Sequence, residues 1–107
     1  MNIWIEIEKL KGQTLATLDQ RKPFDIVEVT EHAVIVRPHK SETERQISRD
    51  AIENACRRLI AAGEITRTEI HSDFSEFNPA YVVAILAALP EVKHSIRPIR
   101  LWITGNS

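Results

Sequence analysis

The sequence predicts an α+β fold in a single domain, residues 1–107, on the basis of three observations. Short segments rich in β-branched residues fill the first half of the chain, which indicates an antiparallel β meander or a small open barrel. Two main helices, 49–62 and 79–89, are predicted in the second half and are expected to pack against this sheet. At the two ends, residues 3–7 and 99–103 alternate between faces with the period of a half-buried strand.

The terminal strands are expected to pair with each other in antiparallel fashion. In the register that places Trp4 opposite Trp102, Glu6 lies opposite Arg100. Aromatic and oppositely charged pairs across two strands contribute roughly 0.2 to 1 kcal/mol each, enough to favour a register. The predicted sheet therefore includes both ends of the chain.

The meander is predicted between residues 13 and 47. Its strand segments are separated by short polar or proline-containing stretches that have the chemistry of turns. Short connections favour antiparallel neighbours, so consecutive segments should lie side by side. The four segments are 13–18, 24–29, 33–37 and 43–47.

The helix at 49–62 has a signal at each end. Ser48 can cap its first free amides, and Gly63 follows its last turn as a C-terminal stop. Just beyond it, Thr66 and Glu69 have the spacing of a capping box, which predicts a short helix to about His71. The residues of the predicted apolar stripe on the first helix are Ile52, Ala55, Cys56, Leu59 and Ile60.

The helix at 79–89 lies in a stretch without a charged side chain, from Phe77 to Pro90. Asn78 is its expected N-cap, Pro79 its first residue, and Pro90 ends it. A helix that is apolar on all sides is ordinarily buried, so burial within the monomer is favoured. The alternative is a surface that only a partner covers.

The composition narrows the location and the partners. A formal net charge of −1 lacks the strong basic excess that is usual in nucleic-acid-binding domains. The single Cys56 cannot form an internal disulfide, and the first residues lack the order of a signal peptide, so a cytoplasmic protein is expected. No apolar run reaches the roughly 18 residues that cross a bilayer, so no membrane partner is expected.

No catalytic residue, metal ligand or cofactor-binding residue is predicted. The four histidines and Cys56 stand at no zinc-binding spacing, and the three glycines are too scattered for a phosphate-binding loop. Cys56 lies on an apolar helix stripe, where burial keeps a thiol protonated and inert.

The favoured function is that of a small non-enzymatic binding module that acts through protein contacts, with a homodimer possible. One alternative is a nucleic-acid accessory protein that uses a basic hairpin at 37–49, although acidic residues interleave with the basic ones. Another is a small enzyme that uses the acidic loop 64–76, with Glu69 and Asp73 as its carboxylates. The candidate phosphate-binding residues of the hairpin are Arg37, Lys40, Arg45 and Arg49.

Overall fold

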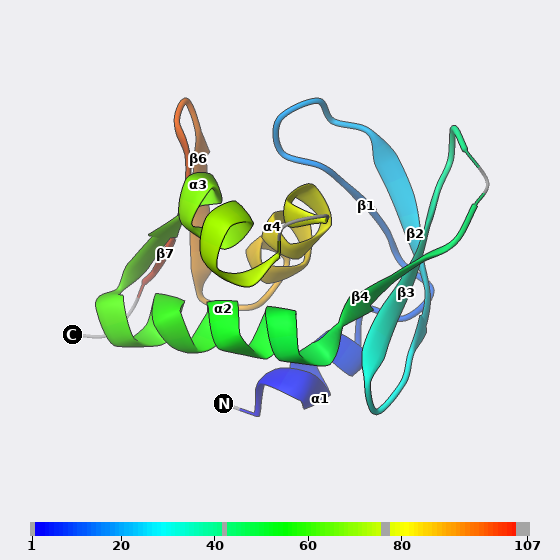
Figure 1. Ribbon diagram of the computed structural model, residues 1–107, viewed down its shortest axis with the longest axis horizontal. Helices are drawn as coiled ribbons and strands as arrows, with labels where there is room; N and C mark the ends of the chain where they lie inside the picture. The colour runs from blue at the N-terminus through cyan, green and yellow to red at the C-terminus, as the bar shows by residue number, and fades with distance from the viewer. Residues whose placement is uncertain (1, 42, 76–77, 105–107) are drawn as a thin grey trace.

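Two antiparallel sheets lie on either side of a central helix in the computed structural model, which describes residues 2–41, 43–75 and 78–104 (Figure 1). A second, longer helix runs beneath the central one from the first sheet to the second. The α+β class is therefore confirmed. The elements in chain order are α1 (Ile3–Glu8), β1 (Thr14–Ala16), β2 (Pro23–Val29), β3 (Ala33–Pro38), β4 (Arg45–Ser48), α2 (Arg49–Ala62), β5 (Glu64–Thr66), α3 (Arg67–Glu69), the π-helical turn η1 (Ile70–Phe74), α4 (Pro79–Ala87), β6 (Val92–Ile96) and β7 (Ile99–Ile103).

The first sheet is the predicted meander. Its strands follow the order β1-β2-β3-β4, and every neighbouring pair is antiparallel. The register between β2 and β3 shifts between Ile26 and Glu28, at a β-bulge. Inward-facing residues of this sheet, Phe24 and Val34 among them, are fully buried. Sequential short-loop pairing was therefore correctly predicted for all four strands.

The predicted pairing of the two chain ends is wrong. Residues 3–8 form helix α1, and Trp102 of β7 lies opposite Glu64 and Lys93 in a second sheet of order β5-β7-β6. The stretch IWIEI, residues 3–7, fits the period of a strand and also the period of a helix. As a helix it places Trp4 and Ile7, three residues apart, on the buried face of α1. For β7, pairing with the adjacent β6 closes a far shorter loop than pairing with the N-terminus.

Helix α2 has the predicted bounds and the predicted caps. The Ser48 hydroxyl accepts a hydrogen bond from the amide of Ala51 at 3.0 Å, and Gly63 takes a left-handed conformation with φ of 83°. Four residues of the predicted stripe are buried, but Ile60 is 50% exposed, so its inclusion was wrong. Each step of four residues turns about 40° around a helix, which places Ile60 beyond Cys56 at the rim of the stripe.

The short helix after β5 begins with the predicted capping box. The Thr66 hydroxyl accepts from the amide of Glu69, and the Glu69 carboxylate accepts from the amide of Thr66. Helix α3 then continues as η1 to Phe74, a little further than the expected end at His71.

Helix α4 begins at Pro79 as predicted and ends at Ala87, two residues early. Asn78 makes no side-chain capping bond, which corrects that prediction. Phe77 lies outside the described residues. Five successive positions around the helix are buried, which confirms burial within the monomer for the middle of α4. The predicted burial is not complete, because Ala80 and Ala87 are half-buried and Ala88 is exposed. The buried residues of α4 are Val82, Val83, Ala84, Ile85 and Leu86.

The two sheets and the helices share a continuous hydrophobic core. Helix α4 packs against α2, β1, β6 and β7, so it touches elements of both sheets. The radius of gyration is 12.7 Å, close to the value of about 13 Å expected for a compact domain of 100 residues. Within the described ranges, no helix combines the length and apolar character that crossing a bilayer requires.

Candidate binding cleft

A cleft of about 250 Å³ opens between the first sheet and the helices α3 and α4. Four separate parts of the chain line it: the loop from β1 to β2, the junction of β3 with its following turn, the start of α3 and the start of α4. Three of its described lining residues are cationic, namely Lys22, Lys40 and Arg67. Asp19 is acidic.

The loop between β1 and β2 is held by Thr17, whose side chain is buried. The amide of Thr17 donates to the carbonyl of Lys22 at 3.1 Å, and the Thr17 hydroxyl accepts from the amide of Lys22 at 3.0 Å. Arg21 closes the turn with a left-handed φ of 53°. These bonds fix the backbone that carries Asp19 and Lys22 at the rim of the cleft.

The turn after β3, which carries Lys40 at the cleft, is bonded to β2 through His39. Its amide donates to the carbonyl of Pro23 at 3.1 Å, and its ring Nε2 lies 2.8 Å from Oδ1 of Asp25. The same Oδ1 accepts from the hydroxyl of Thr14 at 2.7 Å. The hydrogen bond from His39, and then that from Thr14, holds the pKa of the Asp25 carboxyl below its usual value. Lys40 therefore follows a residue that is anchored to the neighbouring strand.

The remaining wall is apolar and rests on the core. Tyr81 of α4 packs edge-on against the buried Phe24, with ring centroids 5.0 Å apart. The guanidinium of Arg45 lies 5.9 Å from the centroid of the Tyr81 ring. Pro23 and Pro38 complete this side. A ligand in the cleft would meet a positively charged rim and an apolar wall.

Arg67 has unused hydrogen-bonding capacity at the cleft. Its Nη2 lies 3.7 Å from Oδ2 of Asp19, a distance too long for a hydrogen bond. Its Nε is buried and has no hydrogen-bond partner among the residues that the structure describes. A buried donor without an acceptor costs about 1–3 kcal/mol, so a carboxylate that pairs with the Arg67 guanidinium would relieve this cost.

The four candidate residues of the basic hairpin have different environments. Lys40 lines the cleft and Arg45 lies over Tyr81 behind it, while Arg37 is 3.8 Å from Glu44. Arg49 is the first residue of α2, and its guanidinium stacks on Trp4 of α1, 4.7 Å from the centre of the ring. The structure therefore places Lys40 at the cleft and Arg45 over one of its lining residues, whereas Arg37 and Arg49 have other partners.

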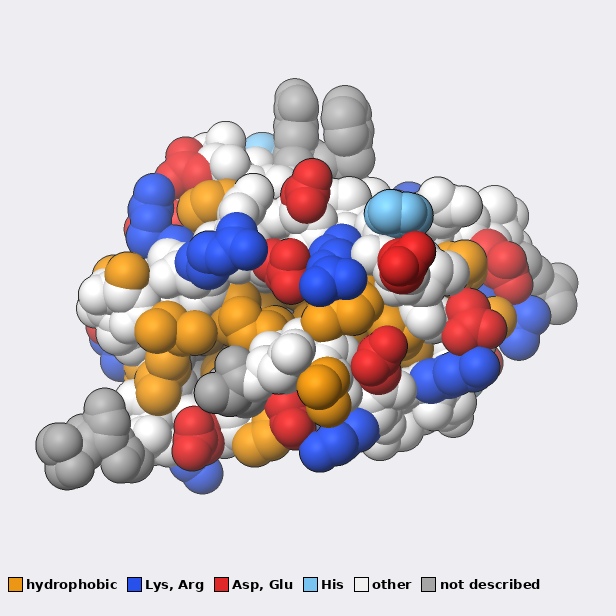
Figure 2. Space-filling view, turned by 90° about the horizontal axis from the view of Figure 1, so that it is seen from below, with side chains coloured by type: hydrophobic (Ala, Val, Ile, Leu, Met, Phe, Trp, Pro, Cys, Tyr) orange, Lys and Arg blue, Asp and Glu red, His pale blue; other side chains and the backbone are white. Residues whose placement is uncertain are grey.

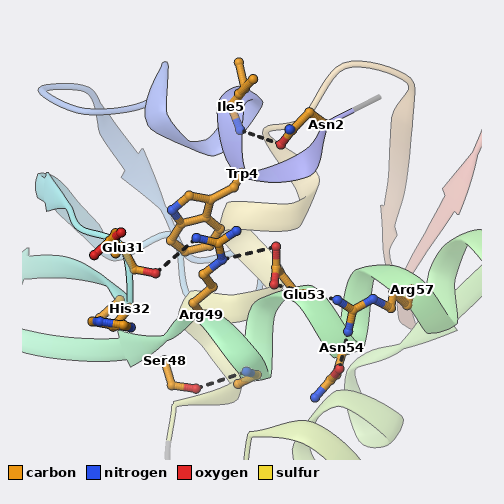
Figure 3. Close-up of polar contacts among 12 residues, drawn as sticks. Asn2, Trp4, Ile5, Glu31, His32, Ser48, Arg49, Glu53, Asn54 and Arg57 are labelled. Atoms are coloured by element: carbon orange, nitrogen blue, oxygen red, sulfur yellow. Dashed lines mark hydrogen bonds and ion pairs between the residues drawn. The ribbon is translucent and has the colours of Figure 1, made fainter.

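Arg49 is held by several groups at once (Figure 3). Its Nε lies 3.2 Å from Glu53, and its Nη1 donates to the carbonyl of Glu31 at 3.1 Å. Glu53 also approaches Arg57 at 3.8 Å, so Arg49, Glu53 and Arg57 form a row of ion pairs along α2. These contacts assign Arg49 to the junction of α1, α2 and the first sheet.

The described carboxylates of the acidic loop 64–76 are paired with arginines. Glu69 and Asp73 lie 3.4 and 3.7 Å from the same Nη1 of Arg58. Glu64 lies 3.5 Å from Arg100, and Glu76 lies outside the described residues. Catalysis by Glu69 and Asp73 stays a prediction. Among the described residues, no three His, Cys, Asp or Glu side chains are grouped in a way that could hold a metal ion.

Sequence reasoning found one cation of the cleft, Lys40, and missed Lys22 and Arg67. Lys22 lies in a stretch that was interpreted as a turn, and Arg67 lies inside a capping box, so each had a local explanation. No spacing in the sequence connects the two residues. Only the packing of α3 against the β1–β2 loop brings them to one site.

The structure is that of a small α+β protein with an open cleft whose charged lining residues are mainly cationic. Comparison with family models, with curated proteins and with solved structures produced no match.

Cys56 is expected to be unreactive in the native protein. Its side chain is 1% exposed, and burial, with a smaller contribution from Glu53, raises the pKa of the thiol from 9.0 to about 11. Since the thiolate is the nucleophile, a shift of this size lowers the reactive fraction at pH 7 about 100-fold. Reaction with a disulfide reagent, followed by absorbance, should be at least that much slower in buffer than in concentrated guanidinium chloride. Equal rates would contradict the buried position.

Proposed function

We propose that this protein is a small non-enzymatic binding module that holds an acidic segment of a partner protein in its cleft. The observation that supports this proposal is the lining itself, in which Lys22, Lys40 and Arg67 stand against the single carboxylate of Asp19 among the described residues. Oppositely charged surfaces attract and orient partners before contact.

The size of the cleft favours part of a larger ligand. Small-molecule and cofactor sites are commonly about 300–1,000 Å³, and this cleft is about 250 Å³. A glutamate side chain combines an apolar stem with a carboxylate. Tyr81 and Pro38 can contact the stem while a lysine at the rim binds the carboxylate. An extended acidic peptide would place such a side chain in the cleft and remain outside it elsewhere.

The two alternatives have less support from the contacts. A row of phosphate-binding residues along the basic hairpin would require the pairs of Arg37 with Glu44 and Arg49 with Glu53 to open. An acidic catalytic site would require Glu69 and Asp73 to act while sharing Arg58. A cytoplasmic location belongs to the proposal, because the buried thiol of Cys56 needs no oxidising compartment.

The test is a fluorescence-anisotropy titration at low salt with a labelled peptide of alternating glutamate and alanine. We expect saturable binding that weakens as salt screens the rim charges. Lys40→Glu should weaken binding about tenfold, because it replaces an attraction by a repulsion. Arg57→Glu is the matched control, since it makes the same change in net charge on exposed α2 and should leave binding within about twofold.

Three outcomes would contradict the proposal: no saturable binding at low salt, equal binding of the peptide with glutamine in place of glutamate, or equal loss in the two variants. A phosphoserine peptide and a DNA duplex belong in the same assay. Tighter binding of either would favour a phosphate ligand, and for the duplex it would favour the hairpin alternative.

Self-association is a second candidate, and one observation favours it. The face formed by α1 and α2, opposite the cleft, carries an apolar strip with basic and acidic side chains along its margins (Figure 2). Ile5 of α1 is 49% exposed and Ile60 of α2 is 50% exposed. Light scattering across a range of concentrations decides this point, since a dimer that Ile5→Lys abolishes would establish the homodimer.

A further inference from the structure

We propose that the Asp19 carboxylate competes with the partner segment for the cleft. Asp19 contacts Arg67 until a carboxylate of the acidic partner segment replaces it. The ligand group is thus a carboxylate and its principal partner is Arg67, a residue that the sequence patterns do not single out. This inference rests on the proposed function, and it adds a specific exchange between an internal and an external carboxylate.

The contact between Asp19 and Arg67 is suited to exchange. Oδ2 of Asp19 lies 3.7 Å from Nη2 of Arg67, so the two groups attract each other without a hydrogen bond. Their side chains are 31% and 39% exposed, where water and salt weaken such a pair. The other oxygen of Asp19 accepts from the amide of Gln20 at 2.8 Å, so its own turn holds this carboxylate. Asp19 can therefore lose Arg67 and keep a partner.

Arg67 can bind a better-placed carboxylate. A guanidinium has five N–H donors in a planar fork that matches the two oxygens of a carboxylate. The Nε donor of Arg67 is unpaired among the described residues, and its Nη2 has only the long contact. A ligand carboxylate that draws the guanidinium into the cleft would free Nε from its buried position and pair the fork.

The backbone that carries Arg67 is fixed. Thr66 forms the capping box with Glu69 on one side and pairs with Arg100 of β7 on the other. The side chain of Arg67 can thus change its partner without a change in the fold. Lys22 and Lys40 line the same cleft and add positive charge for an incoming group.

Competition from the Asp19 carboxylate also implies a preference among ligands. A single carboxylate must displace Asp19 and then remain near it, which lowers its affinity. A segment with two or more acidic side chains can pair one with Arg67 and another with Lys40 at the same time. The cleft should therefore select acidic segments over isolated carboxylates.

The test uses the same labelled acidic peptide with the single variants Asp19→Asn, Arg67→Met and Arg67→Lys. A double variant combines Asp19→Asn with Arg67→Met. Asp19→Asn should tighten binding about threefold, because it removes a weak exposed ion pair. Arg67→Met should weaken binding about tenfold, and Arg67→Lys less, since lysine keeps the charge but lacks the fork. The double variant should bind like Arg67→Met, because Asp19 acts through Arg67. Thermal melting of each variant verifies that it is folded.

The outcomes separate this inference from the proposed function. If the wild type binds and depends on Lys40, but Asp19→Asn has no effect or weakens binding, the exchange is wrong and the binding module stands. If Asp19→Asn tightens binding as much in the Arg67→Met background as in the wild type, repulsion between Asp19 and the acidic peptide explains the effect. The exchange at Arg67 is then also wrong. If neither the wild type nor Asp19→Asn binds the peptide, the proposed function fails. Binding by Asp19→Asn alone would also contradict the proposed function, because the wild type itself must bind the peptide at low salt.

Discussion

Replacement of Leu86 by alanine is expected to lower the free energy of unfolding by about 2–5 kcal/mol, as truncation of a fully buried leucine does. Leu86 is 0% exposed on α4, the helix that touches elements of both sheets. A cavity at this place removes contacts from several elements at once. Because domains of this kind have only about 5–15 kcal/mol of stability, the loss is a large fraction of the total.

The measurement is urea denaturation followed by circular dichroism. The midpoint should fall while the slope stays near the wild-type value, since the surface exposed on unfolding is almost the same. Ile60→Ala is the matched control, because it also shortens an apolar side chain on a helix, but one that is 50% exposed. It should change stability by less than about 0.5 kcal/mol. Equal losses in the two variants would show that α4 is not the centre of the core.

Replacement of Trp4 by alanine is expected to cost about 3–5 kcal/mol and to release α1 from the rest of the molecule. Trp4 is 5% exposed, its Nε1 donates to the carbonyl of Thr30 at 3.0 Å, and Arg49 stacks on its ring. Helix α1 has six residues, too few to be stable in water without tertiary contacts. Trp4 and Ile7 are its buried residues, so loss of one leaves little to hold it.

Hydrogen exchange of the amides in α1, together with urea denaturation, tests this expectation. In Trp4→Ala the amides of residues 6–8 should lose protection before those of α2. Trp4→Phe should be intermediate, because it keeps a ring for Arg49 and loses the bond to Thr30. Ile5→Ala, on the exposed side of the same helix, should change neither quantity. Unaltered protection in Trp4→Ala would mean that other contacts hold α1.

The parts of the fold that were predicted correctly depend on signals within a few residues. Ser48 and Gly63 bound α2 because a hydroxyl and a left-handed glycine satisfy its free backbone groups locally. The capping box at Thr66 has the same character. The meander follows from short connections, which bring each strand next to its predecessor. In these regions local chemistry and the final structure agree.

The prediction failed where one pattern fitted two structures. Residues 3–7 alternate as a strand does and also place Trp4 and Ile7 on one face of a helix. The choice came from partners distant in sequence, namely the carbonyl of Thr30 and the guanidinium of Arg49, which hold Trp4. The sequence of the segment alone contains no information about where these groups lie.

The candidate site shows the same division. Lys40 was recognised because other basic residues surround it in the sequence, whereas Lys22, Arg67 and Asp19 come from stretches that had sufficient local explanations. The cleft exists because α3 and α4 pack beside the β1–β2 loop. Its charge is the sum of residues that are separated by tens of positions along the chain.

The sequence by itself determined the α+β class, the order of the meander, the caps of α2 and the burial of the chargeless helix. These features depend on hydrogen bonds between near neighbours and on the removal of apolar side chains from water, both of which a local pattern specifies. Only the tertiary structure decided that the N-terminal segment is a helix, that β7 pairs with β5 and β6, and that Asp19 meets Arg67. Those choices depend on which distant groups come into contact, and such contacts form only when the whole core is assembled.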